Sequence, residues 1–166
     1  MAGLARAIAT RVGGAGGLFV VNDRADIARL AGAGGVHVGQ GDLGPGDVRQ
    51  IIGPDGVVGV STHSAEQVRQ ALLESVSYVA IGPFAATDSK GRPAGTPVGV
   101  SGVREAAGIA GAAGPPVVAI GGITLESARD VLAAGAASVA VISDLVAGDP
   151  VERAAAYRAA LDLQGA

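Results

Sequence analysis

The segment "PVVAIGGITLESARDVLAAGAASVAVISD", residues Pro116 to Asp144, reads as one complete structural unit. It opens with a short β-branched run, turns at two glycines, continues with helical spacing, stops at Gly135 and closes with a second β-branched run. Continuous apolar runs bounded by turn residues are typical of strands buried on both faces. The segment therefore predicts two parallel strands joined through a helix.

The same alternation of strand and helix extends over the rest of the chain. Apolar runs of the strand type are "LFVVND" from Leu18, "GVHVG" from Gly35, "VVGVS" from Val57, "YVAIG" from Tyr78, "VVAIG" from Val117 and "SVAVIS" from Ser138. The helical segments that follow them are "ADIARLAG", "GDVRQIIG", "AEQVRQALLE", "VSGVREAAGIAG", "TLESARDVLAAG" and "PVERAAAYRAALDL", and an amphipathic helix at Ala2 to Val12 precedes the first run. These βα repeats predict a parallel sheet with helices outside it, in a single domain over residues 1–166.

Local signals for helix ends agree with these boundaries. Ser64 with Gln67 has the pattern of a capping box, and Asp149 followed by Pro150 has the pattern of an N-cap with proline in the first turn. Glycines stand where three of the helices are expected to stop, at Gly32, Gly114 and Gly135.

Repeated βα units form either an open doubly wound sheet or a (β/α)8 barrel. A doubly wound dinucleotide fold needs its glycine fingerprint after the first strand, whereas "GGAGGLFVV" places the glycines before one. We therefore expect an α/β fold of the (β/α)8 TIM-barrel type, incomplete, with six βα units. Barrel enzymes build their sites on the carboxyl ends of the strands. Polar residues stand at those ends here, at Asn22 and Asp23, Gln40 and Asp42, Ser61 and His63, Thr87 to Lys90, Gly121 to Thr124, and Ile142 to Asp144.

Composition narrows the class of partner. The formal charge of −3, the lack of a basic cluster and an aromatic content of only 2% argue against nucleic acid. The prolines in "AAGIAGAAGPPVVAIGGITL" argue against a membrane span there. With no cysteine, disulfides and thiolate chemistry are excluded. We expect small-molecule partners and a cytoplasmic location. The sequence leaves open whether the chain forms a homo-oligomer.

A long polar loop follows one of the strands, in "YVAIGPFAATDSKGRPAGTPVG" from Tyr78 to Gly99. Loops of this length in compact domains are commonly lids or binding loops. Thr87, Ser89 and Lys90 stand close together in it, and these residue types hold phosphate. The last two strands end in "AIGGIT" and "VISD", and a phosphate site at the final two strands is a recurrent feature of barrels.

The runs "VVNDRADIA", "GVHVGQGDL", "VVGVSTHS", "YVAIGPFAATDSK", "PVVAIGGIT" and "SVAVISDL", in this order and spacing, resemble thiamine-phosphate synthase, also called thiamine-phosphate pyrophosphorylase. The resemblance extends from about Leu18 to Leu163. It implies a transferase of thiamine biosynthesis that joins hydroxymethylpyrimidine diphosphate to thiazole phosphate and releases pyrophosphate. In such a reaction the C–O bond ionises and the thiazole nitrogen captures the pyrimidine cation, so the protein must neutralise a leaving diphosphate and position the substrates.

The resemblance also implies roles for individual residues. Asp23 and Asp42 would bind Mg²⁺, which commonly takes one or two carboxylates together with phosphate oxygens. Lys90 and Ser61 would act on the pyrimidine diphosphate as the catalytic residues, with Asn22 beside them. The residues around the thiazole phosphate would be Thr87, Asp88, Ser89, Gly122, Ile142 and Ser143. On position alone, Asp23 could instead cap the helix near Ala25. We expect His37 and His63 to be structural.

The sequence departs from this family in one respect. Its members begin with a strand, a helix and a second strand that ends in a basic "QLREK"-like motif, and no such motif occurs in these 166 residues. Six strands would then stand where a closed barrel has eight. The missing motif would supply an arginine and a lysine to the diphosphate. Each charged hydrogen bond lost to a developing anion costs about 1.5–3 kcal/mol, and about 1.4 kcal/mol is a tenfold change in rate. Because two such contacts would be lost, we expect the activity of these 166 residues alone to be impaired at least about a hundredfold. Two alternatives remain open: a thiazole tautomerase-like enzyme, which has histidine where Pro83 stands, and a non-catalytic phosphate-ligand-binding protein.

Overall fold

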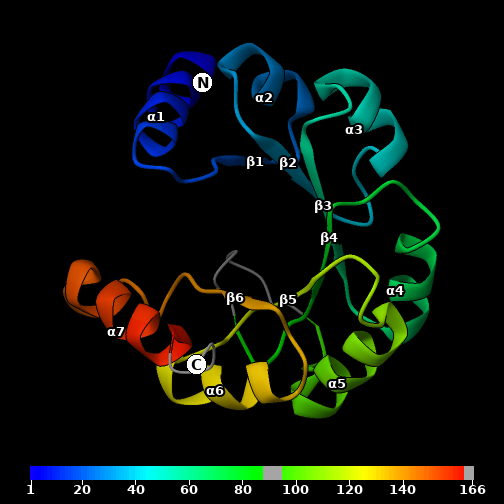
Figure 1. The fold of residues 1–166 in the computed structure, drawn as a ribbon, viewed down its shortest axis with the longest axis vertical. Helices are drawn as coiled ribbons and strands as arrows, with labels where there is room; N and C mark the ends of the chain where they lie inside the picture. The colour runs from blue at the N-terminus through cyan, green and yellow to red at the C-terminus, as the bar shows by residue number, and fades with distance from the viewer. Residues whose placement is uncertain (88–94, 163–166) are drawn as a thin grey trace.

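The computed structural model describes residues 1–87 and 95–162, in which strands and helices alternate along the chain. The strands are β1 (Val20–Asn22), β2 (Gly35–Val38), β3 (Val57–Thr62), β4 (Tyr78–Ile81), β5 (Val117–Ile120) and β6 (Ser138–Ala140). The helices are α1 (Ala2–Gly14), α2 (Ala25–Ala31), α3 (Pro45–Ile52), α4 (Ala65–Ala71), α5 (Gly99–Ala110), α6 (Leu125–Ala133) and α7 (Pro150–Asp162). The helices lie outside a curved arc of strands, with α1 and α7 at its two ends (Figure 1).

The six strands form one parallel sheet whose order in space is their order in the sequence, β1 to β6. A doubly wound sheet reverses its strand order at one point, and this sheet does not. The architecture is therefore a curled half-barrel, an incomplete (β/α) barrel, and the predicted fold class is confirmed. Within the described residues β1 and β6 are the two edge strands.

Successive residues of each strand point alternately toward the helices and toward the inside of the arc. Val36, Val58 and Val79 are fully buried and belong to the core that the helices cover. Because partners in a parallel register point to the same side, the residues between them face inward. His37 pairs with Gly59, and Gly59 pairs with Tyr78, so one inward-facing row crosses three strands.

Most of the predicted helix ends are confirmed. The side chain of Ser64 accepts a hydrogen bond from the backbone N–H of Gln67, and Gly32 ends α2 in the left-handed conformation. The Gln67 side chain accepts the N–H of His63 and not that of Ser64, so only half of the predicted capping box forms. The prediction for Gly114 is wrong, because α5 ends at Ala110 with Gly111 as its cap.

Two further helix starts are fixed by side chains. Asp149 accepts the backbone N–H groups of Val151 and Glu152, which confirms it as an N-cap. A full reciprocal capping box, which is not among the predicted caps, joins Thr124 to Ser127 at the start of α6.

In the described ranges, no helix has both the length and the apolar character needed to cross a membrane.

Candidate functional site

The ends of β1 and β2 bring Asp23 beside the chain segment that contains His37. The backbone N–H of Asp23 donates to the carbonyl of His37 at 2.8 Å. Asp23 has a φ of +64°, the only positive φ of a non-glycine residue in the described part of the chain. Asp and Asn adopt this conformation more readily than other residues, and backbone outliers of this kind cluster at functional sites. Arg24 occupies the cap position of α2, so Asp23 does not stand where a helix cap would.

Asp42 is exposed and lies in the loop after β2, which is the strand next to β1. One carboxylate oxygen accepts the backbone N–H of Gly39 at 2.8 Å, which fixes the orientation of the group. Asp23 and Asp42 thus supply two exposed carboxylates at adjacent strand ends, a donor set that suits Mg²⁺ when a substrate adds phosphate oxygens. No group of three or more His, Cys, Asp or Glu side chains able to hold a metal ion occurs among residues 1–87 and 95–162.

Ser61, near the end of β3, is half-buried and held through both its side chain and its backbone. Its hydroxyl oxygen lies 2.7 Å from Nε2 of His37, and its carbonyl accepts the side-chain amide of Gln40 at 2.7 Å. These contacts join the ends of β2 and β3 and fix the position of the hydroxyl. Asn22 lies in register with His37 at the end of β1 and is exposed.

His63 is hydrogen-bonded to two neighbouring segments of the chain. Its Nδ1 lies 2.5 Å from the carbonyl oxygen of Gly82, and its backbone N–H donates to the side chain of Gln67. The imidazole thereby connects the turn after β3 to the end of β4.

The loop after β4 is hydrogen-bonded to the loop after β5. The N–H of Phe84 donates to the carbonyl of Ile120 at 2.8 Å, and the N–H of Ala85 donates to that of Gly121 at 3.0 Å. Thr87 lies close to Gly121, since a Cβ built there would be 3.5 Å from the Thr87 methyl carbon. The structure therefore brings Thr87 to the glycine turn. The predicted site residues Asp88, Ser89 and Lys90 lie outside the described residues.

Gly122 is required by the fold itself. Its φ is +71°, and a Cβ at this position would lie 2.7 Å from the carbonyl oxygen of Ala85. A side chain at position 122 would thus collide with the backbone of the loop after β4, and the strain would not depend on any bound phosphate. Replacement of Gly122 therefore cannot by itself test a phosphate site.

The loop after β6 contains exposed Ile142 and Ser143 and is anchored by Asp144. The Asp144 carboxylate accepts three hydrogen bonds from the guanidinium group of Arg153, at 2.8 and 2.9 Å from Nη2 and at 3.1 Å from Nε, and one from the Tyr157 hydroxyl. It also accepts the backbone N–H of Leu125 at the start of α6. This cluster of Asp144, Arg153, Tyr157 and Leu125 ties α7 and α6 to the segment that carries Ser143.

The electrostatics of this cluster favour the charged carboxylate. The Arg153 guanidinium beside Asp144 holds the pKa of that carboxyl below its usual value, with the Tyr157 hydroxyl and the Leu125 N–H contributing to the same shift. Burial, together with the hydrogen bond to Asp144, raises the pKa of the Tyr157 hydroxyl. Tyr157 is therefore protonated at neutral pH and remains a donor.

We expect Asp144→Asn to lower the melting temperature by about 3 °C or more at pH 7, because it removes the charged acceptor that Arg153 and Tyr157 share. Since folding lowers this pKa, the contribution is complete above the pH where an unfolded aspartate titrates, about 4, and is lost as the pH falls further. Calorimetric melts from pH 7 to pH 3 should show the difference between parent and variant shrinking with acid. The exposed Asp130→Asn on α6 is the control, and an equal loss there would contradict this role.

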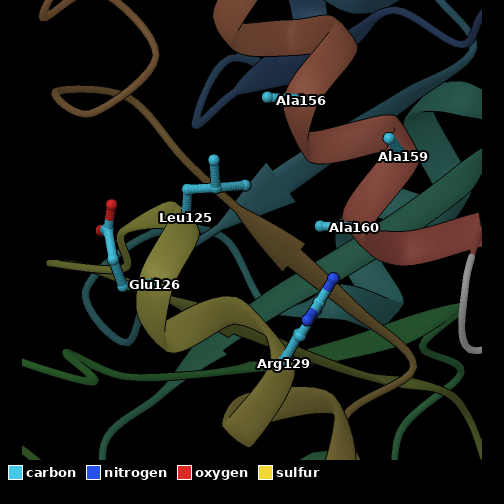
Figure 2. A pocket seen from close by; sticks show the side chains of 6 residues that line it. All are labelled: Leu125, Glu126, Arg129, Ala156, Ala159 and Ala160. Atoms are coloured by element: carbon cyan, nitrogen blue, oxygen red, sulfur yellow. The ribbon is translucent and has the colours of Figure 1, made fainter.

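A hollow of about 400 Å³ lies between α6 and α7 (Figure 2). It is lined mainly by the small side chains of Ala156, Ala159 and Ala160 on α7 and by Leu125 and Arg129 on α6, with Glu126 at its edge. Of the residues that the structure describes, none of the predicted site residues lines it. The hollow is a feature of the helical layer, separate from the strand ends.

Two sets of side-chain contacts were not predicted from the sequence: that of Tyr78 with His37, and those of Arg153 and Tyr157 with Asp144. Tyr78 approaches His37 although 41 residues separate them, and the signal available was a glycine between them in the sheet. Arg153 and Tyr157 lie one helical turn apart on α7 and both reach Asp144. Their i, i+4 spacing shows that they share a helix face, but it does not indicate the carboxylate that they bind.

Comparison with known proteins gives consistent results. A family model described as thiamine monophosphate synthase matches residues 1–145. The thiamine-phosphate synthase of Koribacter versatilis is 48% identical over 139 residues, which are 84% of this chain and 64% of that protein. That of Moorella thermoacetica is 42% identical over 152 residues, 92% of this chain and 70% of that protein. The chain thus spans less than two thirds of the first of these relatives.

Among solved structures, a thiamine phosphate pyrophosphorylase from Pyrococcus furiosus superposes with a TM-score of 0.85 at 28% identity. The match covers 98% of this chain and 76% of that one. The half-barrel described above therefore has the same arrangement of elements as most of that solved structure.

Proposed function

Because the chain belongs to the thiamine monophosphate synthase family, we propose that its strand-end loops form the site that joins hydroxymethylpyrimidine diphosphate to thiazole phosphate, giving thiamine phosphate and pyrophosphate. The observation that carries this proposal is the gathering of polar groups at one edge of the sheet. Asp23 and Ser61 lie at the ends of β1 and β3, and Thr87, in the loop after β4, lies close to the glycine turn after β5.

The reaction requires that the charge on the leaving diphosphate be stabilised and that the two substrates be positioned for attack. The C–O bond of the pyrimidine diphosphate ionises, and the thiazole nitrogen then attacks the resulting cation, so no general base has to remove a proton before the new bond forms. Ser61 would donate a hydrogen bond to the diphosphate, and Asn22 would bind it from the neighbouring strand end. Lys90, by the family resemblance, would supply positive charge to the leaving group. Fixed donors of this kind stabilise the charge that develops as the bond breaks.

Asp23 and Asp42 would hold magnesium. The metal, when bound, would neutralise the diphosphate. The two carboxylates suit this role because both are exposed and they follow adjacent strands. The orientation of the Asp42 carboxylate is fixed by the hydrogen bond that one of its oxygens accepts from the Gly39 N–H. The remaining ligands would come from the substrate and water, as is usual for magnesium bound to a diphosphate.

The thiazole phosphate would lie at the other half of the arc. Thr87 and the glycine turn at Gly121 and Gly122 face this region from β4 and β5, and the loop after β6 adds the exposed Ser143 and Ile142. Asp88 and Ser89 would complete the set by the family resemblance. The backbone bonds that connect the loops after β4 and β5 support this grouping.

The proposal is tested by mixing the 166-residue chain with both substrates and measuring thiamine phosphate. We expect slow formation, at least about a hundredfold below the rate of full-length relatives, because the basic motif of the family does not occur in this sequence. The assay therefore uses enzyme in excess of substrate, so that one turnover is detected. We also expect thiazole phosphate alone to raise the melting temperature, since a ligand that binds only the folded state stabilises it.

Other outcomes discriminate the alternatives. Isomerisation of the thiazole phosphate without coupling would identify a tautomerase-like enzyme. Thermal protection without product in either reaction would identify a protein that only binds the phosphate ligand. Absence of both protection and product would contradict the proposal, and turnover at the rate of full-length relatives would contradict the expected impairment.

A further inference from the structure

One row of inward-facing residues crosses β2, β3 and β4 below the candidate site. His37 is in register with Gly59, and Gly59 is in register with Tyr78. Ser61 lies two residues beyond Gly59 on the same side of β3, toward the strand ends. The row thus places an imidazole and a phenol directly beneath a hydroxyl of the candidate site.

The missing side chain at Gly59 lets Tyr78 reach His37 across the intervening strand. A Cβ at position 59 would lie 2.0 Å from Cζ of Tyr78, so the ring fills the space that a side chain would occupy. The Tyr78 ring lies nearly parallel to the imidazole, with centroids 5.6 Å apart and an interplanar angle of 20°. Its hydroxyl oxygen lies 2.8 Å from Nδ1 of His37.

The other imidazole nitrogen faces Ser61. Nε2 of His37 lies 2.7 Å from the Ser61 hydroxyl oxygen, so each ring nitrogen has a partner. A neutral imidazole donates from one nitrogen and accepts at the other. If Nδ1 accepts from Tyr78, Nε2 donates to Ser61 and leaves the serine hydrogen free. If Nδ1 donates, Nε2 accepts that hydrogen, and Ser61 can then offer a ligand only its lone pairs.

The environment of Tyr78 favours the first arrangement. Burial raises the pKa of the Tyr78 hydroxyl, so the phenol is protonated at neutral pH and has a hydrogen to donate. A phenol is also a better donor than acceptor because its oxygen lone pair is delocalised into the ring. Both properties direct the Tyr78 hydrogen toward Nδ1.

We propose that His37 carries its hydrogen on Nε2, fixed there by Tyr78, and that both are positioning residues that make the Ser61 hydroxyl a hydrogen-bond donor toward an anionic ligand. That the ligand is the pyrimidine diphosphate rests on the proposed function. The placement of the hydrogens does not rest on it.

Nitrogen-15 NMR of the histidines tests the placement directly. The sequence contains two histidines, and the second is an internal reference. His63 presents Nδ1 to a backbone carbonyl, which only accepts, so its hydrogen lies on Nδ1. Long-range ¹H–¹⁵N spectra at neutral pH are expected to show opposite tautomers for the two residues. A hydrogen on Nδ1 of His37, alone or together with one on Nε2, would overturn the proposal.

The variant Tyr78→Phe removes only the hydroxyl and keeps the ring over Gly59. We expect His37 to change from one tautomer to a mixture, while the His63 signals stay unchanged. An unaltered His37 spectrum in a folded variant would show that Tyr78 does not fix the tautomer and would refute its role. If this variant fails to fold, the spectrum of the parent protein still decides the hydrogen on His37.

The effect on the ligand is measured separately, with pyrophosphate as the probe. Tyr78→Phe should weaken pyrophosphate binding by a few fold, and Ser61→Ala should weaken it by about tenfold. In the double variant, Tyr78→Phe should have no further effect, because it acts through the Ser61 hydroxyl. Additive losses would contradict this mechanism. Failure of the chain to form thiamine phosphate would bear on the proposed function and leave the NMR result intact.

Discussion

Asp23→Asn is expected to weaken magnesium-dependent binding of pyrophosphate at least about tenfold, equivalent to about 1.4 kcal/mol. The substitution removes the charge of the proposed metal ligand but keeps the shape of the side chain. Asparagine is required here because Asp23 has a φ of +64°, which Asn tolerates and Ala does not. An alanine variant would combine the loss of the ligand with backbone strain. Titration calorimetry with magnesium and with a chelator measures the effect.

Asp26→Asn is the matched control, because Asp26 lies three residues away on α2 and pairs with exposed Arg24. It should leave pyrophosphate binding unchanged within a factor of about two. Asp42→Asn should resemble Asp23→Asn if the two carboxylates share one metal. Equal pyrophosphate affinity with and without magnesium in the parent protein would remove the metal from the proposed site.

Gly82→Ala is expected to lower the melting temperature by about 5 °C or more, the consequence of an overpacking cost of about 2–3 kcal/mol. Gly82 directly follows β4, and a Cβ there would lie 2.3 Å from the carbonyl oxygen of Ile120 on β5. The obstacle is backbone, so it cannot rotate away as a side chain could. The collision would separate the two strand ends and displace the loop that carries Thr87. Thermal melts measure the loss of stability.

Gly108→Ala provides the comparison within the same protein. Gly108 lies within α5, and a Cβ there meets nothing within 4 Å. This variant should be neutral or more stable by about 0.5–1 kcal/mol, since alanine favours helix. Equal melting temperatures for the two variants would show that the close approach of Gly82 to Ile120 does not exclude a side chain at position 82.

The order of the elements could be predicted from the sequence because strand and helix periodicities are local signals. Val36 and Val38 alternate with residues of other kinds, and such patterns need no knowledge of distant contacts. The end of α5 is harder to predict, because the sequence makes Gly111 and Gly114 equally plausible C-terminal caps. Which glycine caps the helix depends on how the helix packs.

The contacts within the site could be predicted only in part. Asp23 and Ser61 can be proposed as site residues because the family resemblance extends to them, but the positive φ of Asp23 has no signature in sequence. Tyr78 and His37 meet only because the sheet register places Gly59 between them. Asp144 was noted as a polar strand-end residue, while its partners Arg153 and Tyr157 come from a helix whose packing fixes the contact.

The sequential strand order has a consequence for how the protein unfolds. Each strand of the described sheet pairs only with its neighbours in the chain, so stability is transmitted from one βα unit to the next, as in a repeat protein. Opening should begin at the ends of the arc, since β6 is largely exposed whereas β4 is buried over most of its length. The proposed ligand groups extend from the loop after β1 to the loop after β6. Without substrate, βα units at the two ends of the arc should exchange their amide hydrogens independently. Substrates that contact loops at both ends of the arc would link these units, so binding would make unfolding more cooperative.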